Sequence, residues 1–458
     1  MSPNRHLPPV CSRGLKPKPH PTVVPSDHPE RIPQRCGTTH SRELSRRDAS
    51  SWPPPASAAC RSPAGSTSFA RGAHPRQAAE RRACCCGWTA GRAAGHVRPS
   101  AGTAGGGPYQ EIATSVPGIK ISEHFPQVAT VMQHAAILRG MSTGEGAHPR
   151  AKYNLHTGYR EGQGGVSYPS IGSIVARELG RPEFPLPSYV SIGNRSYGAG
   201  FLGSKYQPLA VADAARGVEN LHPLVSAAAF DGRVDLLDQM EKAFHRDYQA
   251  GAGVAHHTTY KQAVTLMKSK EAKAFDLTLE PASARKAYGG TKFGDGCLLA
   301  RRLIETGVSF VEVSLGGWDT HQNNFDRVKE LSRQVDPAMA SLVRDLKERG
   351  LLDSTLVVWA GDFGRTPKIN SRGAKPGRDH YPRAWSTVLV GGGIQGGQVI
   401  GKTDKEGATV VERPIPTVDF LATLCSILGV DYTRTNTTPN SRPVRVVDKG
   451  AKPISQLL

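Results

Sequence analysis

The stretch STLVVWAGDFGRTP, residues 354–367, joins an apolar run to a polar loop. Its first half is rich in β-branched and aromatic side chains, which favour a strand buried on both faces. Its second half places Asp362 and Arg365 directly after that strand, between glycines. In open α/β sheets, ligands bind beyond the carboxyl ends of the strands. The stretch therefore predicts a buried strand that delivers an acid and a cation to a binding edge.

Similar apolar runs alternate with amphipathic segments through the rest of the chain. We expect strands at 135–139, 187–193, 308–317, 354–360 and 386–392, and helices at 170–180, 294–307, 326–350 and 416–429. Most of the strands are predominantly apolar, the one at 187–193 alternates, and several of the helices end at a glycine. This alternation predicts an α/β fold with a mostly parallel sheet covered by helices on both faces.

The first quarter of the chain has a different composition. Residues 1–107 carry 16 Lys and Arg against five Asp and Glu, which is +11 of the total net charge of +19. Aliphatic residues are scarce there, so the segment cannot bury enough apolar surface to order itself. A basic tail also suits nucleic acid, but no aromatic interleaving or nucleic-acid motif accompanies the charge. We expect 1–107 to be disordered, 108–458 to form the folded domain, and no nucleic-acid partner.

An export signal is expected near the start, but its core is missing. LSRRDAS, residues 44–50, resembles a twin-arginine signal, yet a proline- and serine-rich stretch follows in place of the apolar core. Reading GC-rich codons in a shifted register recovers such a core. We therefore interpret residues from about 49 to about 105 as a frame-shifted translation. No later segment reaches the roughly 20 apolar residues of a membrane span.

Acids and imidazoles gather where the predicted strands end. The side chains are Asp319 and His321 after strand 308–317, Asp362 and Arg365 after strand 354–360, and Asp379 and His380 before strand 386–392. Asp and His are oxygen and nitrogen ligands of zinc and similar ions. Taken singly, Asp362 also suits a turn cap, His380 a loop histidine, and Asp319 with His321 a hydrogen-bonded pair. Their shared position at successive strand ends favours a metal site.

The sequence from about 106 to 458 resembles the "domain of unknown function 1501" family, a branch of the alkaline phosphatase and sulfatase superfamily. The resemblance lies in EIATSVPGIKISEHFP, GGWDTHQNN, WAGDFGRTPKIN, GRDHYP and the closing RPVRVVDKGAKPISQLL. It implies a three-layer sandwich with a metal site at strand ends. By order along the chain, it implies that Asp319, His321 and His380 bind one divalent metal and Asp362 a second. Zinc is the expected ion, with calcium or another divalent ion as alternatives.

Some features depart from the superfamily pattern. Phe363 stands where alkaline phosphatases have a histidine, and a single residue separates Asp319 from His321. The N-terminal metal aspartate is missing from the stretch 87–100. By position, His148 lies nearest the expected nucleophile, which makes it the candidate catalytic residue, with a metal ligand or a structural residue as the alternatives. Substrate binding is expected from Arg365, whose planar fork suits a tetrahedral anion, and from Arg150 and His156.

These observations predict a metal-dependent hydrolase of phosphate or sulfate esters, acting on a small molecule or a polysaccharide. Intact relatives with a twin-arginine signal would be exported to the periplasm or beyond. The departures leave two alternatives, a non-catalytic binding or scaffold protein on the same fold and the inactive product of a damaged gene.

Overall fold

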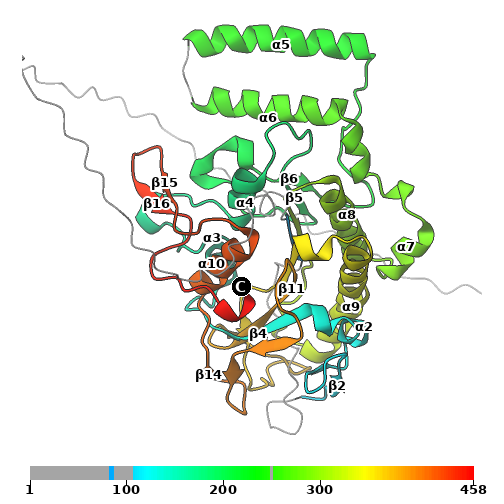
Figure 1. Cartoon of the computed structure of the whole chain (residues 1–458), viewed down its shortest axis with the longest axis vertical. Coiled ribbons are helices and arrows are strands. Elements are labelled where there is room, and N and C mark those ends of the chain that lie inside the picture. The colour runs from blue at the N-terminus through cyan, green and yellow to red at the C-terminus, as the bar shows by residue number, and fades with distance from the viewer. Residues whose placement is uncertain (1–81, 87–106, 248–250) are drawn as a thin grey trace, which may run out of the picture. The chain divides into compact units, whose positions relative to one another are not determined.

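The structure, a computed structural model, describes residues 82–86, 107–247 and 251–458 (Figure 1). Its centre is a sheet of eight strands. In spatial order they are β12 (Gln398–Ile400), β4 (Ala135–Met141), β11 (Trp385–Gly391), β8 (Thr355–Trp359), β1 (Arg82–Cys86), β7 (Phe310–Val313), β5 (Tyr189–Ile192) and β6 (Leu209–Val211).

Within this sheet, β11 runs against the other strands. It pairs antiparallel with β4 and β8, and the remaining neighbouring pairs are parallel. Because β11 is reversed, its amino end lies at the same edge as the carboxyl ends of β4 and β8. The predicted mixed α/β fold is confirmed, with one strand of opposite direction near its middle.

Where the structure describes the side chains of the central strands, alternate ones enter two separate cores. In β8, Val357 and Trp359 pack with helices on one face, whereas Leu356 and Val358 pack with helices on the other. This period-two division is what a strand apolar at every position requires. The sheet is therefore the middle of three layers, as Figure 1 shows with α8 and α9 on one side and α4 and α10 on the other.

Several helices begin or end at a capping residue. The helices are α2 (Pro126–Ala129), α3 (His148–Thr157), α4 (Ile171–Leu179), α5 (Ala227–Asp247), α6 (Gly251–Lys268), α7 (Ala282–Ala287), α8 (Lys292–Thr306), α9 (Asn324–Glu348) and α10 (Thr417–Leu428). Helix α8 is a clear example. Thr291 caps its first turn by accepting from the Gly294 amide, and Gly307 ends it with a φ of 117°. That conformation is costly for any residue with a Cβ atom.

The loops outside the central sheet contain small two-stranded sheets. They are β2 (Glu111–Ala113) with β3 (Lys120–Ser122), β9 (Gly364–Arg365) with β10 (His380–Tyr381), β13 (Lys402–Thr403) with β14 (Val410–Glu412), and β15 (Thr435–Thr437) with β16 (Pro443–Arg445).

Strand β1 comes from the segment that its composition predicts to be disordered. It lies between β7 and β8, with Arg82 opposite Thr355 and Cys86 opposite both Val313 and Trp359. The boundary expected near residue 107 therefore falls after a central strand. The remaining predictions for the N-terminus, the signal at 44–50 and the shifted register on either side of β1, lie outside the described residues.

Helices α5 and α6 form an antiparallel hairpin that is mostly exposed (Figure 1). No described side chain of α5 is buried, and in α6 the buried one is Leu266. Ion pairs join the two helices, including Lys268 with Asp231 at 2.6 Å. Across the described residues, no helix combines the length and apolar character needed to cross a membrane.

Candidate metal centre

One edge of the sheet carries the side chains that the sequence singled out. This edge holds the carboxyl ends of β4, β7 and β8 and the amino end of β11. His148 follows β4 as the first residue of α3, Asp319 and His321 follow β7, Asp362 follows β8, and His380 lies in β10 just before β11. Residues from four distant parts of the chain thus meet at one place.

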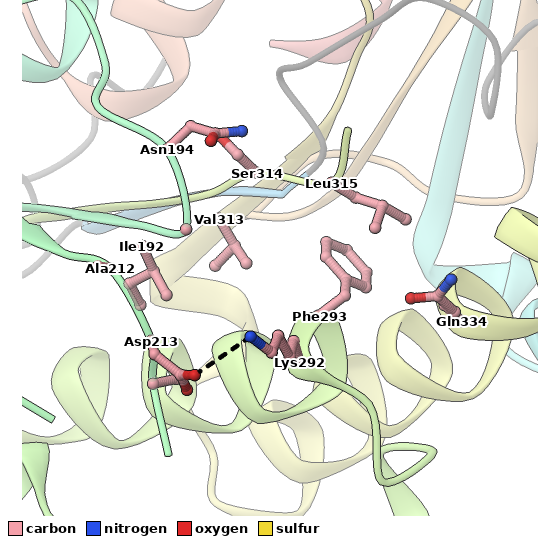
Figure 2. Close-up of a pocket in the computed structure, with 12 residues that line it drawn as sticks. Ile192, Asn194, Ala212, Asp213, Lys292, Phe293, Val313, Ser314, Leu315 and Gln334 are labelled. Carbon is pink, nitrogen blue, oxygen red and sulfur yellow. Dashed lines mark ion pairs between the residues drawn. The ribbon is translucent and has the colours of Figure 1, made fainter. Parts of the chain in front are cut away.

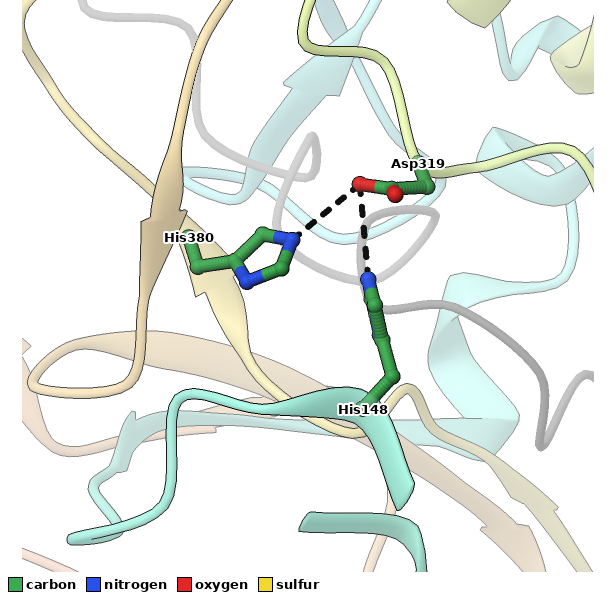
Figure 3. Close-up of side chains that lie close together, drawn as sticks. All are labelled: His148, Asp319 and His380. Atoms are coloured by element: carbon green, nitrogen blue, oxygen red, sulfur yellow. Dashed lines mark hydrogen bonds and ion pairs between the residues drawn. The ribbon is translucent and has the colours of Figure 1, made fainter. Parts of the chain in front are cut away.

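Three imidazoles converge on one oxygen atom of Asp319. The Nε2 atoms of His321 and His380 each lie 3.2 Å from Asp319 Oδ1, and Nε2 of His148 lies 3.3 Å from it. Figure 3 shows His148 and His380 approaching that oxygen from different elements. The Nε2 atoms of His321 and His380 are 3.0 Å apart. A potential ligand atom of His148, Asp319 and His380 lies within 4.8 Å of each of the others.

The second nitrogen of each ring faces an oxygen. Carboxylate and carbonyl oxygens accept hydrogen bonds, so each Nδ1 atom carries the proton and Nε2 is left as the coordinating atom. The acceptors are Asp362 Oδ2 for His148 (2.6 Å), Asp379 Oδ1 for His321 (2.9 Å) and the Gly146 carbonyl for His380 (2.7 Å). Outer partners of this kind fix the orientation of histidine ligands in metal sites.

Asp319 is held ionised by a buried guanidinium. The side chain of Arg365 is 3% exposed and donates to Asp319 Oδ1 and, over 3.2 Å, to the carbonyl of Trp318. Burial raises the pKa of Asp319, but Arg365 above all, together with the neighbouring imidazoles of His380 and His148, outweighs it and holds that pKa far below its usual range. Arg365 therefore stabilises the carboxylate on which the imidazoles converge.

The acid beside His148 is fully enclosed. The side chain of Asp362 has no exposed surface, and its Oδ1 atom has no hydrogen-bond partner within the described residues. Burial lowers the pKa of His148, but bonds and charge from Asp362 and Asp319 raise it above its ordinary value. Phe363 stacks on the His148 ring, with 4.7 Å between the ring centres.

Two residues assigned to substrate binding lie apart from this cluster. Arg150 is exposed and pairs with Glu145 at 2.9 Å. His156 is buried near the far end of α3, where its Nδ1 atom meets the Lys152 carbonyl at 2.7 Å and Nε2 lies 3.4 Å from Glu312. The other predicted site residues, Asp319, His321, Asp362, His380, His148 and Arg365, are brought together.

Asp379, which stands beside His380 in GRDHYP, is placed in the cluster by the sequence analysis but is assigned no role as a ligand or a catalytic residue. A hydrogen bond from His321 lowers the pKa of Asp379, and Arg372 adds to the effect. An acid next to a candidate ligand is the signal that would have revealed such a role. Glu312 was missed, and its signal was a charge inside the otherwise apolar run 308–313.

A cavity of about 400 Å³ opens at the same edge of the sheet, beyond the carboxyl ends of β5, β6 and β7 (Figure 2). Apolar side chains such as Ile192, Val313 and Phe293 line it, together with Asn194 and Gln334. Its charged residues, Asp213 and Lys292, lie 3.5 Å apart and offset each other.

Comparison with known families gives one match. The family described as "Protein of unknown function (DUF1501)" matches residues 73–458, a range that includes β1. No curated protein sequence matches the chain.

Similar solved structures include a sulfatase, PsFucS1, from a Pseudoalteromonas species, with 13% identity over 78% of this chain and 72% of that one, at a TM-score of 0.36. Another is a protein of the alkaline phosphatase superfamily from Vibrio parahaemolyticus, with 11% identity over 77% and 67% and a TM-score of 0.35. The lipoteichoic acid synthase LtaP from Listeria monocytogenes has 9% identity over 77% and 72%, at a TM-score of 0.34.

Proposed function

The chain belongs to the DUF1501 family, and from that premise we propose that it is a metal-dependent hydrolase of phosphate or sulfate esters with an alkaline-phosphatase-like fold. The observation that carries the proposal is the convergence of three imidazole nitrogens on one carboxylate oxygen.

The donor set fits a cation on electrostatic grounds. With each Nδ1 atom bonded to an oxygen, the Nε2 atoms of His148, His321 and His380 present lone pairs toward one another and toward an anionic oxygen. Lone pairs 3.0–3.3 Å apart repel one another unless a proton or a metal ion lies among them. The cluster therefore has the electronic character of a metal site.

The ligand types favour zinc. Zinc takes imidazole nitrogen and carboxylate oxygen, usually with four ligands in closed sites and three in sites that keep an open position. Calcium prefers six to eight oxygen ligands, so three imidazoles argue against it. We propose that Asp319, His321, His380 and His148 hold one Zn²⁺ ion. With four protein ligands, the ion would polarise an ester oxygen or make a water molecule more acidic only by accepting that oxygen as an additional ligand.

The contacts favour changing the roles that the sequence assigned to two residues. The sequence assigns Asp362 to a metal and His148 to catalysis. Because Asp362 bonds to His148 Nδ1 and leaves Nε2 facing Asp319, we propose His148 as a ligand and Asp362 as the acid that orients it. Asp379 would orient His321 in the same way.

The substrate's anionic oxygens need a cation that they can reach from solvent, even if that cation has to leave a surface ion pair such as the one between Arg150 and Glu145. Arg365 is buried against Asp319, so we propose that it holds that carboxylate in place. Arg150 is 61% exposed and lies two residues after His148. We propose that Arg150 meets the phosphate or sulfate group and that the cavity in Figure 2 receives the rest of the ester.

The test measures zinc and ester hydrolysis on the same samples. After loading with Zn²⁺ and removal of free ion, the wild-type chain should retain about one zinc per chain, whereas Asp319→Ala should lose it. Asp326→Ala is the matched control, because that acid is exposed and pairs with Lys375 outside the cluster. Aryl phosphates and aryl sulfates report the activity, which should fall at least about 100-fold in Asp319→Ala. A wild-type chain that retains no zinc contradicts the proposal.

One observation favours a second candidate, a non-catalytic metal-binding or scaffold protein. Within the described residues, no serine, threonine or cysteine side chain bonds to the cluster, and Phe363 fills the position next to Asp362. Zinc retention without turnover of any tested ester would support this candidate.

A further inference from the structure

A buried carboxylate, Glu312, lies within β7, the strand whose following loop carries Asp319 and His321. The side chain of Glu312 is 3% exposed. It accepts hydrogen bonds from the Tyr189 hydroxyl at 2.8 Å and the Ser196 hydroxyl at 2.6 Å, and His156 Nε2 lies 3.4 Å away. Three elements, β5 with its following loop, β7 and α3, are thereby joined at one side chain.

Enclosing this charge is costly unless it is fully bonded. Burial raises the pKa of Glu312, but His156, Ser196 and Tyr189 more than offset it, so the net pKa lies below its ordinary value. An apolar side chain at this position would fill the core as well. Packing alone therefore does not explain why a carboxylate occupies this position in the central sheet.

The position of α3 offers an explanation. His148 is its first residue, and His156 lies two turns further along, about 12 Å away along the axis. Glu312 bonds to the far end of the helix, and this contact links the helix that begins at His148 to the strand whose following loop carries Asp319.

The loop after β5 braces the near end of the same helix. Ser196 bonds to Glu312, and its neighbour Tyr197 donates to the Pro149 carbonyl at 3.0 Å, next to His148. The Tyr197 ring also packs on His156, with 5.0 Å between ring centres, and on Tyr153 at 5.5 Å. Tyr197 therefore contacts α3 near both of its ends, while its neighbour Ser196 contacts Glu312 in β7.

We propose that Glu312 is a positioning residue of the metal centre. Through His156 and the Ser196–Tyr197 loop, it fixes α3 so that Nε2 of His148 points at Asp319. This inference rests on the proposed function, because it assigns His148 to the metal. Glu312 itself touches neither the ligands nor the substrate.

The test uses Co²⁺ as a spectroscopic probe, because its visible absorption reports the number and arrangement of the ligands. Glu312→Gln keeps the shape of the side chain and removes its charge. We expect Co²⁺ affinity to fall about 10–100-fold, the usual effect of losing a partner that orients a ligand, and the absorption band to change as His148 moves.

Glu280→Gln is the matched control. Glu280 is a 10%-exposed carboxylate that pairs with Arg301 and Arg302 beside α8. This substitution removes a comparable charge and should lower stability while leaving the Co²⁺ spectrum unchanged. A folded Glu312→Gln chain with wild-type affinity and spectrum overturns the inference.

Tyr197→Phe decides the matter if Glu312→Gln does not fold. It removes one hydroxyl from a half-buried residue and should still weaken Co²⁺ binding and alter the band; wild-type behaviour of this variant overturns the inference. A wild-type chain that binds no Co²⁺ contradicts the metal site itself, and with it this inference. If the wild-type chain binds Co²⁺ and Glu312→Gln and Tyr197→Phe bind it equally well, only the positioning role of Glu312 is contradicted.

Discussion

Asp319 Oδ1 is shared by three imidazoles and a guanidinium, and this sharing separates the roles of the acids around it. Asp319 supplies the negative charge at the centre, while Asp362 and Asp379 act on the outer nitrogens of the histidines. The three aspartates look equivalent along the chain, because each follows a strand or precedes one. The hydrogen bonds distinguish them.

Asp379→Ala isolates the outer role. The side chain is 35% exposed, so its removal should leave the fold intact. His321 then loses the acceptor that orients its ring, and zinc affinity should fall about 10–100-fold. Competition with a coloured chelator measures the affinity, with Asp326→Ala as the control. An unchanged affinity would mean that Asp379 serves only to hold its loop through Arg372.

Residue types and their order predicted much of the cluster, but not its connections. Asp319, His321, Asp362 and His380 were identifiable because they border apolar strands. The division into ligands and outer acids depends on which oxygen meets which nitrogen, and this is set by the packing of α3 against β7. Sequence spacing carries no such information, and so the sequence assigned His148 to catalysis and Asp362 to a metal, whereas we propose His148 as a ligand and Asp362 as the acid that orients it.

At the scale of single helices, two glycines test opposite effects of the same substitution. Gly172 lies in α4 against the sheet, and a Cβ atom there would lie 2.6 Å from the Tyr189 ring and 2.8 Å from Phe310. Gly232 lies in α5 with nothing within 4 Å of the added atom. One position is limited by packing and the other by helix propensity.

Gly172→Ala should lower the free energy of unfolding by about 1–3 kcal/mol, because the ring of Tyr189 has to move. Gly232→Ala should strengthen α5 by up to about 1 kcal/mol. Denaturant unfolding measures the first effect and amide hydrogen exchange of α5 the second. Equal effects of the two substitutions would contradict the packing of α4 against the sheet.

The ion pairs beside α8 give a pH prediction. Burial raises the pKa of Glu280, but Arg301 and Arg302 lower it by a larger amount. The net pKa therefore lies below its ordinary value of 4.5. The unfolded chain then takes up a proton at a higher pH than the folded chain does. The stability that Glu280 contributes is therefore complete above pH 4.5 and is lost as the pH falls through the folded-state pKa.

Glu280→Gln should accordingly cost about 2 kcal/mol near neutral pH, less than breaking an isolated buried pair, because Arg301 keeps Glu305 and Asp345. The difference from wild type should shrink as the pH falls below 4.5. Urea unfolding at several pH values measures it, and a difference independent of pH would contradict the assigned ionisation.

Elements were predictable where the local pattern agreed with the fold. The apolar runs at 354–360 and 386–392 became β8 and β11 because strands covered on both faces need apolar residues throughout. Strand β1 could not be predicted, since its sequence RACCC lies in a basic, proline-rich context with no alternation or apolar run of useful length. Its place depends on pairing with β7 and β8, which are remote in sequence.

For the whole molecule, we expect the α5–α6 hairpin to be dispensable for the fold. Residues 227–265 can be replaced by a short Gly/Ser linker, because the Lys268–Asp231 pair shows that the two ends of the hairpin lie together. Leu266, which is buried, is kept. The shortened chain should melt within about 4 °C of wild type and retain its zinc. Loss of cooperative melting would show that the hairpin supports the core.

The central place of β1 has a consequence for how the chain is made. Arg82 pairs with Thr355, roughly 270 residues later. At a synthesis rate of about 5–20 residues per second, β1 waits on the order of 15–55 s for its partner to emerge from the ribosome. The middle of the sheet, and the edge where Asp319 and Asp362 meet, can therefore form only after more than three quarters of the chain has been translated. A nascent chain of this protein spends most of its synthesis without a finished core, which makes it a natural client of chaperones that hold unpaired strands.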